Sequence, residues 1–87
     1  MLYQKEFKTD RFGNDILFYG AKEKIPPHLH RVAELIVVEE GCLTLQYRHG
    51  TEYIMAGQCA LILPNCLHAF STSSDGGAWV HTFPVSS

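Results

Sequence analysis

Residues that favour turns interrupt this chain at short intervals, and this spacing is the feature that most limits what it can fold into. No apolar pattern with a period of 3.6 residues connects the segments between the turns. Apolar and polar side chains alternate instead in short runs, and in residues 42–48 they place Leu43, Leu45 and Tyr47 on one face. Short alternating runs separated by turns are typical of an all-β sandwich or barrel.

The pattern predicts about eight or nine short antiparallel strands. Pro26 and Pro27 cannot donate to a central ladder, so residues 22–27 are predicted to be a loop or a strand edge. Residues 58–63 are apolar on both faces, as in a buried strand. A tight turn is predicted at His49-Gly50, and residues 71–77 form the longest polar loop. The predicted strands are residues 2–8, 16–20, 34–39, 42–48, 51–55, 58–63, 67–72 and 78–85.

Length and charge limit the class of protein further. The chain has 87 residues, enough for one domain at most. A fold of this size buries only roughly 60% of the surface that its unfolded chain exposes, so its stability is marginal and we expect a homodimer. A content of 46% hydrophobic and 18% charged residues is too apolar for a disordered chain. The net charge of −2 and the lack of a basic cluster argue against direct binding of nucleic acid.

Cysteine content and apolar runs indicate the compartment. Cys42, Cys59 and Cys66 are odd in number, lack C-x-x-C spacing and lie in apolar runs, so we expect reduced core thiols. No stretch approaches the roughly 18 apolar residues of a membrane span, and no apolar signal region begins the chain. We expect a cytoplasmic protein that does not contact membranes.

Three histidines and one carboxylate are candidates for a single site. His28 and His30 project to the same side of a strand, because alternate side chains share a face. Glu34 has the same parity, but four residues of straight strand span about 13 Å. A chain reversal at residues 31–33 would return Glu34 to the histidines, and His68 would arrive from another strand. Two packed or closed antiparallel sheets permit this arrangement.

These residues resemble the two signature motifs of the cupin superfamily. The motifs here are Gly20, then His28-x-His30-x3-Glu34-x6-Gly41, followed by Gly57-x6-Pro64-x3-His68. The resemblance implies a small jelly-roll barrel, the double-stranded β-helix. In cupin enzymes the corresponding side chains bind a divalent metal, which maps that role onto His28, His30, Glu34 and His68. The sequence departs from the family pattern in three places: seven residues separate Gly20 from His28 instead of five, the second motif is one residue short and lacks its inner glycine, and Thr72 stands where asparagine is common.

Three further features resemble one branch of the superfamily, the N-terminal sensor domains of AraC-type bacterial transcription regulators. They are the shortened segment 64–68, the run 34–41 and the ending Phe83-Pro84-Val85. The resemblance covers residues 15–85, and residues 1–87 are interpreted as a single cupin domain. The chain is compatible with a complete small protein or with the N-terminal part of a longer regulator.

The four candidate ligands have two interpretations. Imidazole nitrogens and a carboxylate suit zinc, iron, nickel, copper or manganese, with open positions left for water or substrate. Alternatively, the same side chains line a metal-free pocket and hydrogen-bond to one another.

Aromatic side chains near the end of the chain are candidates for an effector pocket. Trp79, His81 and Phe83 share a parity in the last strand, and Phe70 shares a face with His68. Flat rings at alternate positions suit stacking against a sugar or another ring. The alternative is that Trp79 and Phe83 belong to the core.

Two functional hypotheses follow. The favoured one is the effector-sensing and dimerising cupin domain of an AraC-type regulator, which binds a small molecule such as a sugar and leaves DNA binding to a domain outside this chain. The second is a metal-dependent small cupin enzyme, an isomerase or oxygenase acting on a small polar substrate. A purely structural β-domain would not account for three histidines and a glutamate at cupin spacing.

Overall fold

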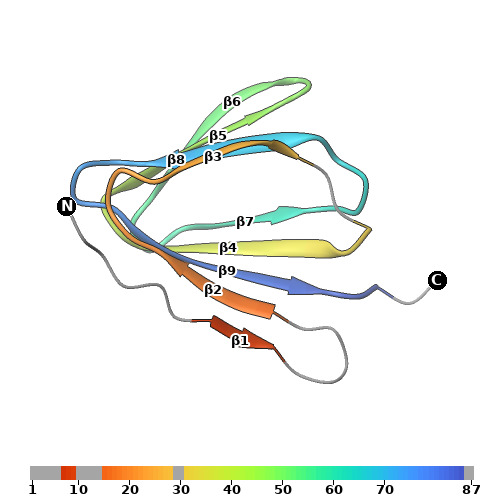
Figure 1. Ribbon diagram of the computed structural model, residues 1–87. Helices are drawn as coiled ribbons and strands as arrows, with labels where there is room; N and C mark the ends of the chain where they lie inside the picture. Colours follow the sequence, from red (N-terminus) through yellow and green to blue (C-terminus); the bar gives the residue numbers. More distant parts are fainter. Residues whose placement is uncertain (1–6, 10–14, 29–30, 86–87) are drawn as a thin grey trace.

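Nine β-strands in two antiparallel sheets make up the described part of the chain, residues 7–9, 15–28 and 31–85 of this computed structural model (Figure 1). One sheet has the strand order β1-β2-β9-β4-β7 and the other β3-β8-β5-β6. Strands far apart in sequence are therefore neighbours, as in a jelly roll, which confirms the predicted cupin-type fold. The strands are β1 (Phe7–Thr9), β2 (Asp15–Tyr19), β3 (Lys24–His28), β4 (Ala33–Glu40), β5 (Cys42–Tyr47), β6 (Gly50–Met55), β7 (Cys59–Ile62), β8 (His68–Thr72) and β9 (Gly77–Phe83).

The core lies between the two sheets and is built by the alternation of side chains along each strand. Ile36 and Val38 of β4 face inward beside Val80 and Ala78 of β9, which are their partners in register. The opposite sheet contributes inward-facing side chains of β5, β6 and β8. The buried hydrophobic cluster is Ile36, Val38, Leu43, Leu45, Ile54, Ile62, Phe70, Ala78 and Val80.

The connection from β4 to β5 requires a glycine. Gly41 has φ +69°, a left-handed conformation that side chains rarely adopt. A Cβ atom there would lie 2.5 Å from Ser73 Oγ and 2.7 Å from Asp75 Oδ1, so the space is also closed. Ser73 in turn accepts a hydrogen bond from the backbone N–H of Cys42 at 3.0 Å. The glycine that ends the first motif therefore lets the loop after β8 pack against the β4–β5 turn.

The prediction that residues 58–63 are buried on both faces is wrong. β7 is the last strand of the five-stranded sheet, and its side chains alternate between the core and the surface. Ile62 is 6% exposed, whereas Leu61 is 58% and Leu63 64% exposed. Cys59 is also exposed, so it is not the core thiol that the apolar run predicted. The run is apolar on both faces, and composition alone does not reveal which face lacks a covering layer.

The strand-edge alternative predicted for residues 22–27 is confirmed, because Pro26 and Pro27 lie in β3 at an edge of its sheet. Two other boundaries differ from the sequence prediction. The tight turn is Arg48-His49, since Gly50 already pairs with Tyr47 as the first residue of β6. The polar loop predicted at 71–77 is shorter, because residues 71 and 72 end β8 and residue 77 begins β9. Of the predicted first strand, residues 2–6 lie outside the described ranges.

Within the described ranges no helix is long and apolar enough to cross a membrane.

Candidate metal centre and ligand pocket

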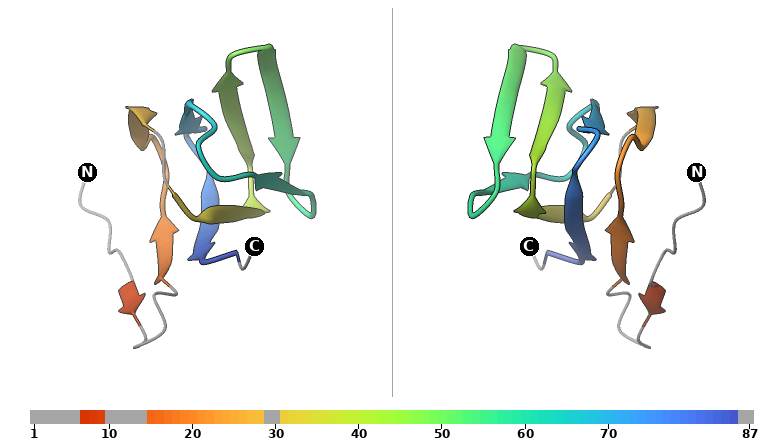
Figure 2. Two further views of the ribbon diagram at one scale, coloured as in Figure 1. Left: turned by 90° about the vertical axis from the view of Figure 1, so that its right-hand side faces the viewer. Right: turned by 90° about the vertical axis from the view of Figure 1, so that its left-hand side faces the viewer.

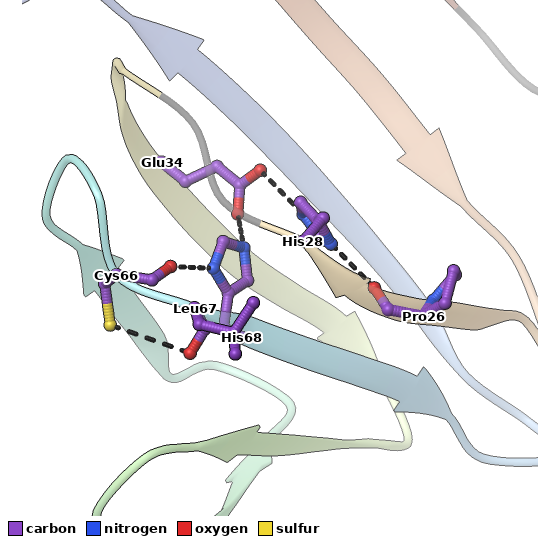
Figure 3. A network of polar contacts seen from close by, with 6 residues as sticks. All are labelled: Pro26, His28, Glu34, Cys66, Leu67 and His68. Atoms are coloured by element: carbon purple, nitrogen blue, oxygen red, sulfur yellow. Dashed lines mark hydrogen bonds and ion pairs between the residues drawn. The ribbon is translucent and has the colours of Figure 1, made fainter.

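A glutamate and a histidine from opposite sheets meet between them. Glu34 lies near the start of β4 and His68 begins β8 (Figure 3). The distance from His68 Nε2 to Glu34 Oε2 is 2.6 Å, and the side chains are 1% and 4% exposed, respectively. His68 Nδ1 lies 2.8 Å from the carbonyl oxygen of Cys66. A carbonyl only accepts hydrogen bonds, so Nδ1 carries a proton and Nε2 is the atom turned toward Glu34.

His28 completes the cluster from β3. Its Nδ1 lies 2.8 Å from the carbonyl oxygen of Pro26, which fixes a proton on Nδ1 as it does in His68. Its Nε2 is 3.8 Å from Glu34 Oε1, and the centroids of the two imidazole rings are 4.2 Å apart. One ligand atom from each of His28, Glu34 and His68 lies within 4.8 Å of the other two. The three side chains therefore converge on one point.

The donor set fits a divalent transition metal. Two imidazole nitrogens and a carboxylate oxygen are ligands that zinc, iron, nickel, copper and manganese accept. In metal sites a ligating histidine usually donates its other N–H to a carbonyl or carboxylate, which orients the ring. The backbone carbonyls of Pro26 and Cys66 fulfil that role here. His28, Glu34 and His68 could hold a metal ion with little change in ring orientation.

Burial and hydrogen bonding act on the His68 pKa in opposite directions. Burial alone would lower the pKa of this imidazole, while hydrogen bonds to Glu34 and to the Cys66 carbonyl, together with the charge of Glu34, raise it. The net effect is a raised pKa. In the absence of a metal, the neighbouring carboxylate of Glu34 thus favours the doubly protonated form of His68 more than water does.

A cavity of about 490 Å³ opens beside this cluster, between the five-stranded sheet and β3. Its walls are mostly apolar, with Glu34 and His28 on one side and the register partners Asp15 and Thr82 also in its lining. The pKa of the Tyr19 hydroxyl is raised by burial and by the charge of Glu34, so this lining group remains a donor. The lining residues are Asp15, Leu17, Tyr19, Ile25, Pro26, His28, Val32, Glu34, Val80 and Thr82.

The structure brings together three of the four ligands expected from the sequence: His28, Glu34 and His68. His30 lies outside the described residues. The reversal expected before Glu34 coincides with bends at residues 31 and 32, after which β4 begins.

The four aromatic residues expected in the effector pocket lie elsewhere than around this cavity. Phe70 is 3% exposed in the core and makes an edge contact with Tyr19, with ring centroids 5.1 Å apart. Trp79, His81 and Phe83 alternate along β9 with the cavity-lining Val80 and Thr82, which places them on the outer face of the sheet. There Trp79 packs against Phe18 with a centroid distance of 4.9 Å.

Sequence reasoning did not identify the residues of β2 and β9 that line the cavity. Leu17 and Tyr19 lie on one face of β2. Val80 and Thr82 lie on the same face of the sheet in the neighbouring strand β9. The available signal was Ala78 and Val80, which are small and apolar as befits an inner face. The larger aromatic side chains at the alternate positions obscured this signal.

Comparisons with known proteins agree with this architecture. Solved structures with a similar fold include a conserved protein of unknown function from Streptococcus pyogenes, with 12% identity, a TM-score of 0.79 and coverage of 97% of this chain and 75% of that one. A cupin-2 domain containing protein from Shewanella frigidimarina has 15% identity, a TM-score of 0.77 and coverage of 93% and 80%. A cupin superfamily protein from Desulfitobacterium hafniense has 10% identity, a TM-score of 0.76 and coverage of 94% and 79%. At these identities the likeness shows the fold alone.

Sequence comparison is more specific about the branch. A search among curated proteins gives no significant match. The model of the AraC-like ligand binding domain family, however, matches residues 16–84, which include β2 to β9 apart from the first residue of β2. The chain therefore has a cupin-type fold and belongs to the family of AraC-like ligand binding domains.

Proposed function

We propose that this domain binds a small-molecule effector for an AraC-type transcription regulator and holds it in the 490 Å³ cavity beside Glu34. The observation that supports this most directly is the composition of the cavity, an apolar chamber with a few polar groups positioned in it. Such a chamber is typical of ligand sites, where apolar walls bury the ligand and polar groups orient it.

The polar groups favour a small hydroxylated effector, of which a sugar is the clearest example. The register partners Asp15 and Thr82 offer acceptors and a hydroxyl, and Tyr19 offers a phenolic donor close enough to Glu34 to be affected by its charge. Leu17 and Val80, which are also register partners on β2 and β9, provide apolar surface beside these polar groups. A sugar ring presents C–H faces as well as hydroxyl groups and so complements both kinds of lining.

A divalent metal would be held by His28, Glu34 and His68, with His30 as a further candidate. When bound, such an ion would supply a Lewis-acidic centre to which a ligand oxygen can bind. The chain's own residues orient the ligands: the carbonyls of Pro26 and Cys66 hold both imidazole rings so that each Nε2 faces Glu34.

The proposed regulator would carry its DNA-binding part outside residues 1–87, because this chain has a net charge of −2 and no basic cluster. Effector binding would shift the equilibrium between conformations of the regulator, which we propose to be a homodimer. We place it in the cytoplasm, where Cys42, Cys59 and Cys66 would stay reduced, since none of them forms a disulfide.

Calorimetric titration with a panel of monosaccharides and sugar acids tests the proposal. The variant Thr82→Val removes a hydroxyl from the cavity lining, and Thr51→Val changes an exposed threonine outside it. We expect at least one sugar to bind, with about tenfold weaker affinity in Thr82→Val and no change in Thr51→Val. Binding that is equal in both variants would place the effector elsewhere.

A metal-dependent enzyme is the second candidate, and the orientation of the two imidazoles supports it. Elemental analysis of protein purified without a metal-affinity step provides the test. Near-stoichiometric metal in the parent and its loss in His28→Ala, but not in the exposed control His49→Ala, would establish the metal centre. Turnover that depends on that metal would then favour the enzyme, whereas metal without turnover would leave the sensor.

A further inference from the structure

The β5–β6 hairpin and β7 diverge from each other at the edges of the two sheets (Figure 2). A second cavity of about 450 Å³ is lined mainly by residues of these strands. We propose that it is a second ligand site, independent of the proposed function, for an apolar molecule that carries an ammonium group. Its lining residues are Leu45, Tyr47, His49, Glu52, Cys59, Ala60, Leu61, Ile62, Leu63, Cys66 and His68.

The two cavities are separate. His28 and Glu34 line the first cavity, and His68 lines the second while its Nε2 points to Glu34. No other residue of the Glu34 cluster borders the second cavity. A ligand there would meet His68 but would not occupy the space over the carboxylate.

The walls of the second cavity are suited to an apolar body. Leu45 and Ile62, 5% and 6% exposed, belong to the core and form part of the lining. Leu61 and Leu63, at 58% and 64% exposed, are among the most exposed large hydrophobic side chains of the described residues. A ligand that covers them removes apolar surface from water, which contributes a favourable free energy of roughly 25 cal/mol per Å². Exposed apolar surface concentrated beside a cavity commonly marks a binding site.

The polar groups of this lining select the charge of the ligand. Tyr47 donates its hydroxyl hydrogen to Glu52 Oε1 at 2.9 Å, so the carboxylate is held in position. No lysine or arginine belongs to the lining, and Arg48 instead borders a different cavity together with Gln46 and Leu67. The lining also contains His49 and His68, but His68 turns its Nε2 to Glu34 on the other side. Apart from these histidines, the one formal charge of the lining is the negative charge of Glu52, with the Tyr47 ring beside it. A carboxylate and an aromatic ring together favour an ammonium group over a carboxylate or phosphate.

The thiols of the cavity do not make it a metal site. Cys59 and Cys66 both border it. Among the described residues, however, the group identified as able to share a metal ion is His28, Glu34 and His68. The thiols therefore contribute soft, weakly polar wall surface, which suits an aryl or alkyl amine.

Chemical-shift mapping of backbone amides across the whole chain tests the inference with two probes of similar size and opposite charge, 2-phenylethylamine and 3-phenylpropionate. We expect the amine to shift the signals of Tyr47 and residues 59–63 and to leave those of Tyr19 and Thr82 unchanged. Glu52→Gln should weaken amine binding about tenfold, as expected for loss of a charge-assisted contact. The double variant Leu61→Ser/Leu63→Ser should weaken it as well, and Met55→Ser, an exposed β6 residue outside the lining, should not.

Three outcomes would overturn the inference. Equal binding of the carboxylate would remove the role of Glu52. Shifts confined to the first cavity, or no shifts at millimolar amine, would show that the second is not a site. Signals of residues 59–63 that change with protein concentration in the absence of the amine would show that a second copy covers the groove. Sugar binding in the first cavity has its own reporters, Tyr19 and Thr82, so the two proposals fail independently.

Discussion

The two cavities on either side of the Glu34–His68 pair are similar in size, about 490 and 450 Å³, but differ in how their side chains are held. In the first, Glu34 is fixed by its hydrogen bond with His68 of the opposite sheet, and His28 by its contact with the carbonyl of Pro26. In the second, the walls include Leu61 of the edge strand β7 and Leu63 just after it, both more than half exposed. The comparison indicates that the polar side chains of the first cavity contribute to the stability of the fold, whereas the exposed leucines of the second can change with little effect on folding.

The largest expected effect comes from breaking the pair that spans the sheets. Glu34→Ala leaves a buried imidazole without its carboxylate, so we expect the free energy of unfolding to fall by about 3 kcal/mol. Urea denaturation in the presence of a chelator measures it. Glu40→Ala, an exposed glutamate at the end of the same strand, serves as the control and should change stability by less than about 0.5 kcal/mol. Equal effects of the two variants would show that the pair has no special role.

A second variant tests the hydrogen bonds by which Thr72 holds the loop between β2 and β3, two strands that line the first cavity. Thr72 is 8% exposed, donates to the carbonyl of Gly20 at 2.6 Å and accepts from the N–H of Glu23 at 2.8 Å. Thr72→Val preserves shape but leaves both backbone groups without this partner, so we expect a loss of about 2 kcal/mol. The matched control is Thr51→Val in β6, which is exposed and should be nearly neutral. A neutral result for Thr72→Val would mean that water replaces the hydroxyl.

Thr72 also illustrates what could be predicted from the sequence. The strands could be predicted because the alternation of apolar and polar side chains is a property of short segments. The convergence of His28, Glu34 and His68 could be predicted from the spacing of the motifs that contain them. Thr72 occupies a position where cupins often have asparagine, and only the structure shows that its hydroxyl joins Gly20 and Glu23, about fifty residues away.

The faces of β7 and β9 could not be assigned in the same way. Both strands carry large apolar side chains at positions of both parities, as Leu61 and Ile62 show in β7. Which face is covered depends on the position of the strand in its sheet, and sheet order is a long-range property. Alternation alone therefore favours the aromatic residues of β9 for an effector pocket, whereas in the structure Val80 and Thr82 line the 490 Å³ cavity.

A pH dependence should distinguish the buried pair of Glu34 and His68 from the exposed polar groups of the second cavity. The pKa of His68 is raised in the folded domain, so the folded state holds this proton more tightly than the unfolded state. The resulting stability is fully present below the unfolded histidine pKa of about 6.5 and is lost as pH rises through the higher, folded pKa. We expect the free energy of unfolding, measured with chelator, to decrease over that interval in the parent.

Two variants assign that decrease to its source. Glu34→Gln removes the charge that favours the imidazolium and should flatten the pH dependence. His49→Gln, at an exposed turn position beside the second cavity, should leave it unchanged. If His49→Gln flattened the dependence instead, the titrating group would be His49, and the pair of Glu34 and His68 would not be its source.

The smallest expected effect is at Leu61, the exposed leucine of β7. Leu61→Ser should change the free energy of unfolding by less than about 0.5 kcal/mol, because a side chain that is 58% exposed gains little from folding. Urea denaturation at two protein concentrations measures it. A loss above about 1 kcal/mol that grows with protein concentration would mean that Leu61 is buried against a second copy in the parent, since association stabilises only the folded state. A small change that does not depend on protein concentration would mean that no second copy covers Leu61. The second cavity would then be accessible to the ammonium ligand that its lining favours.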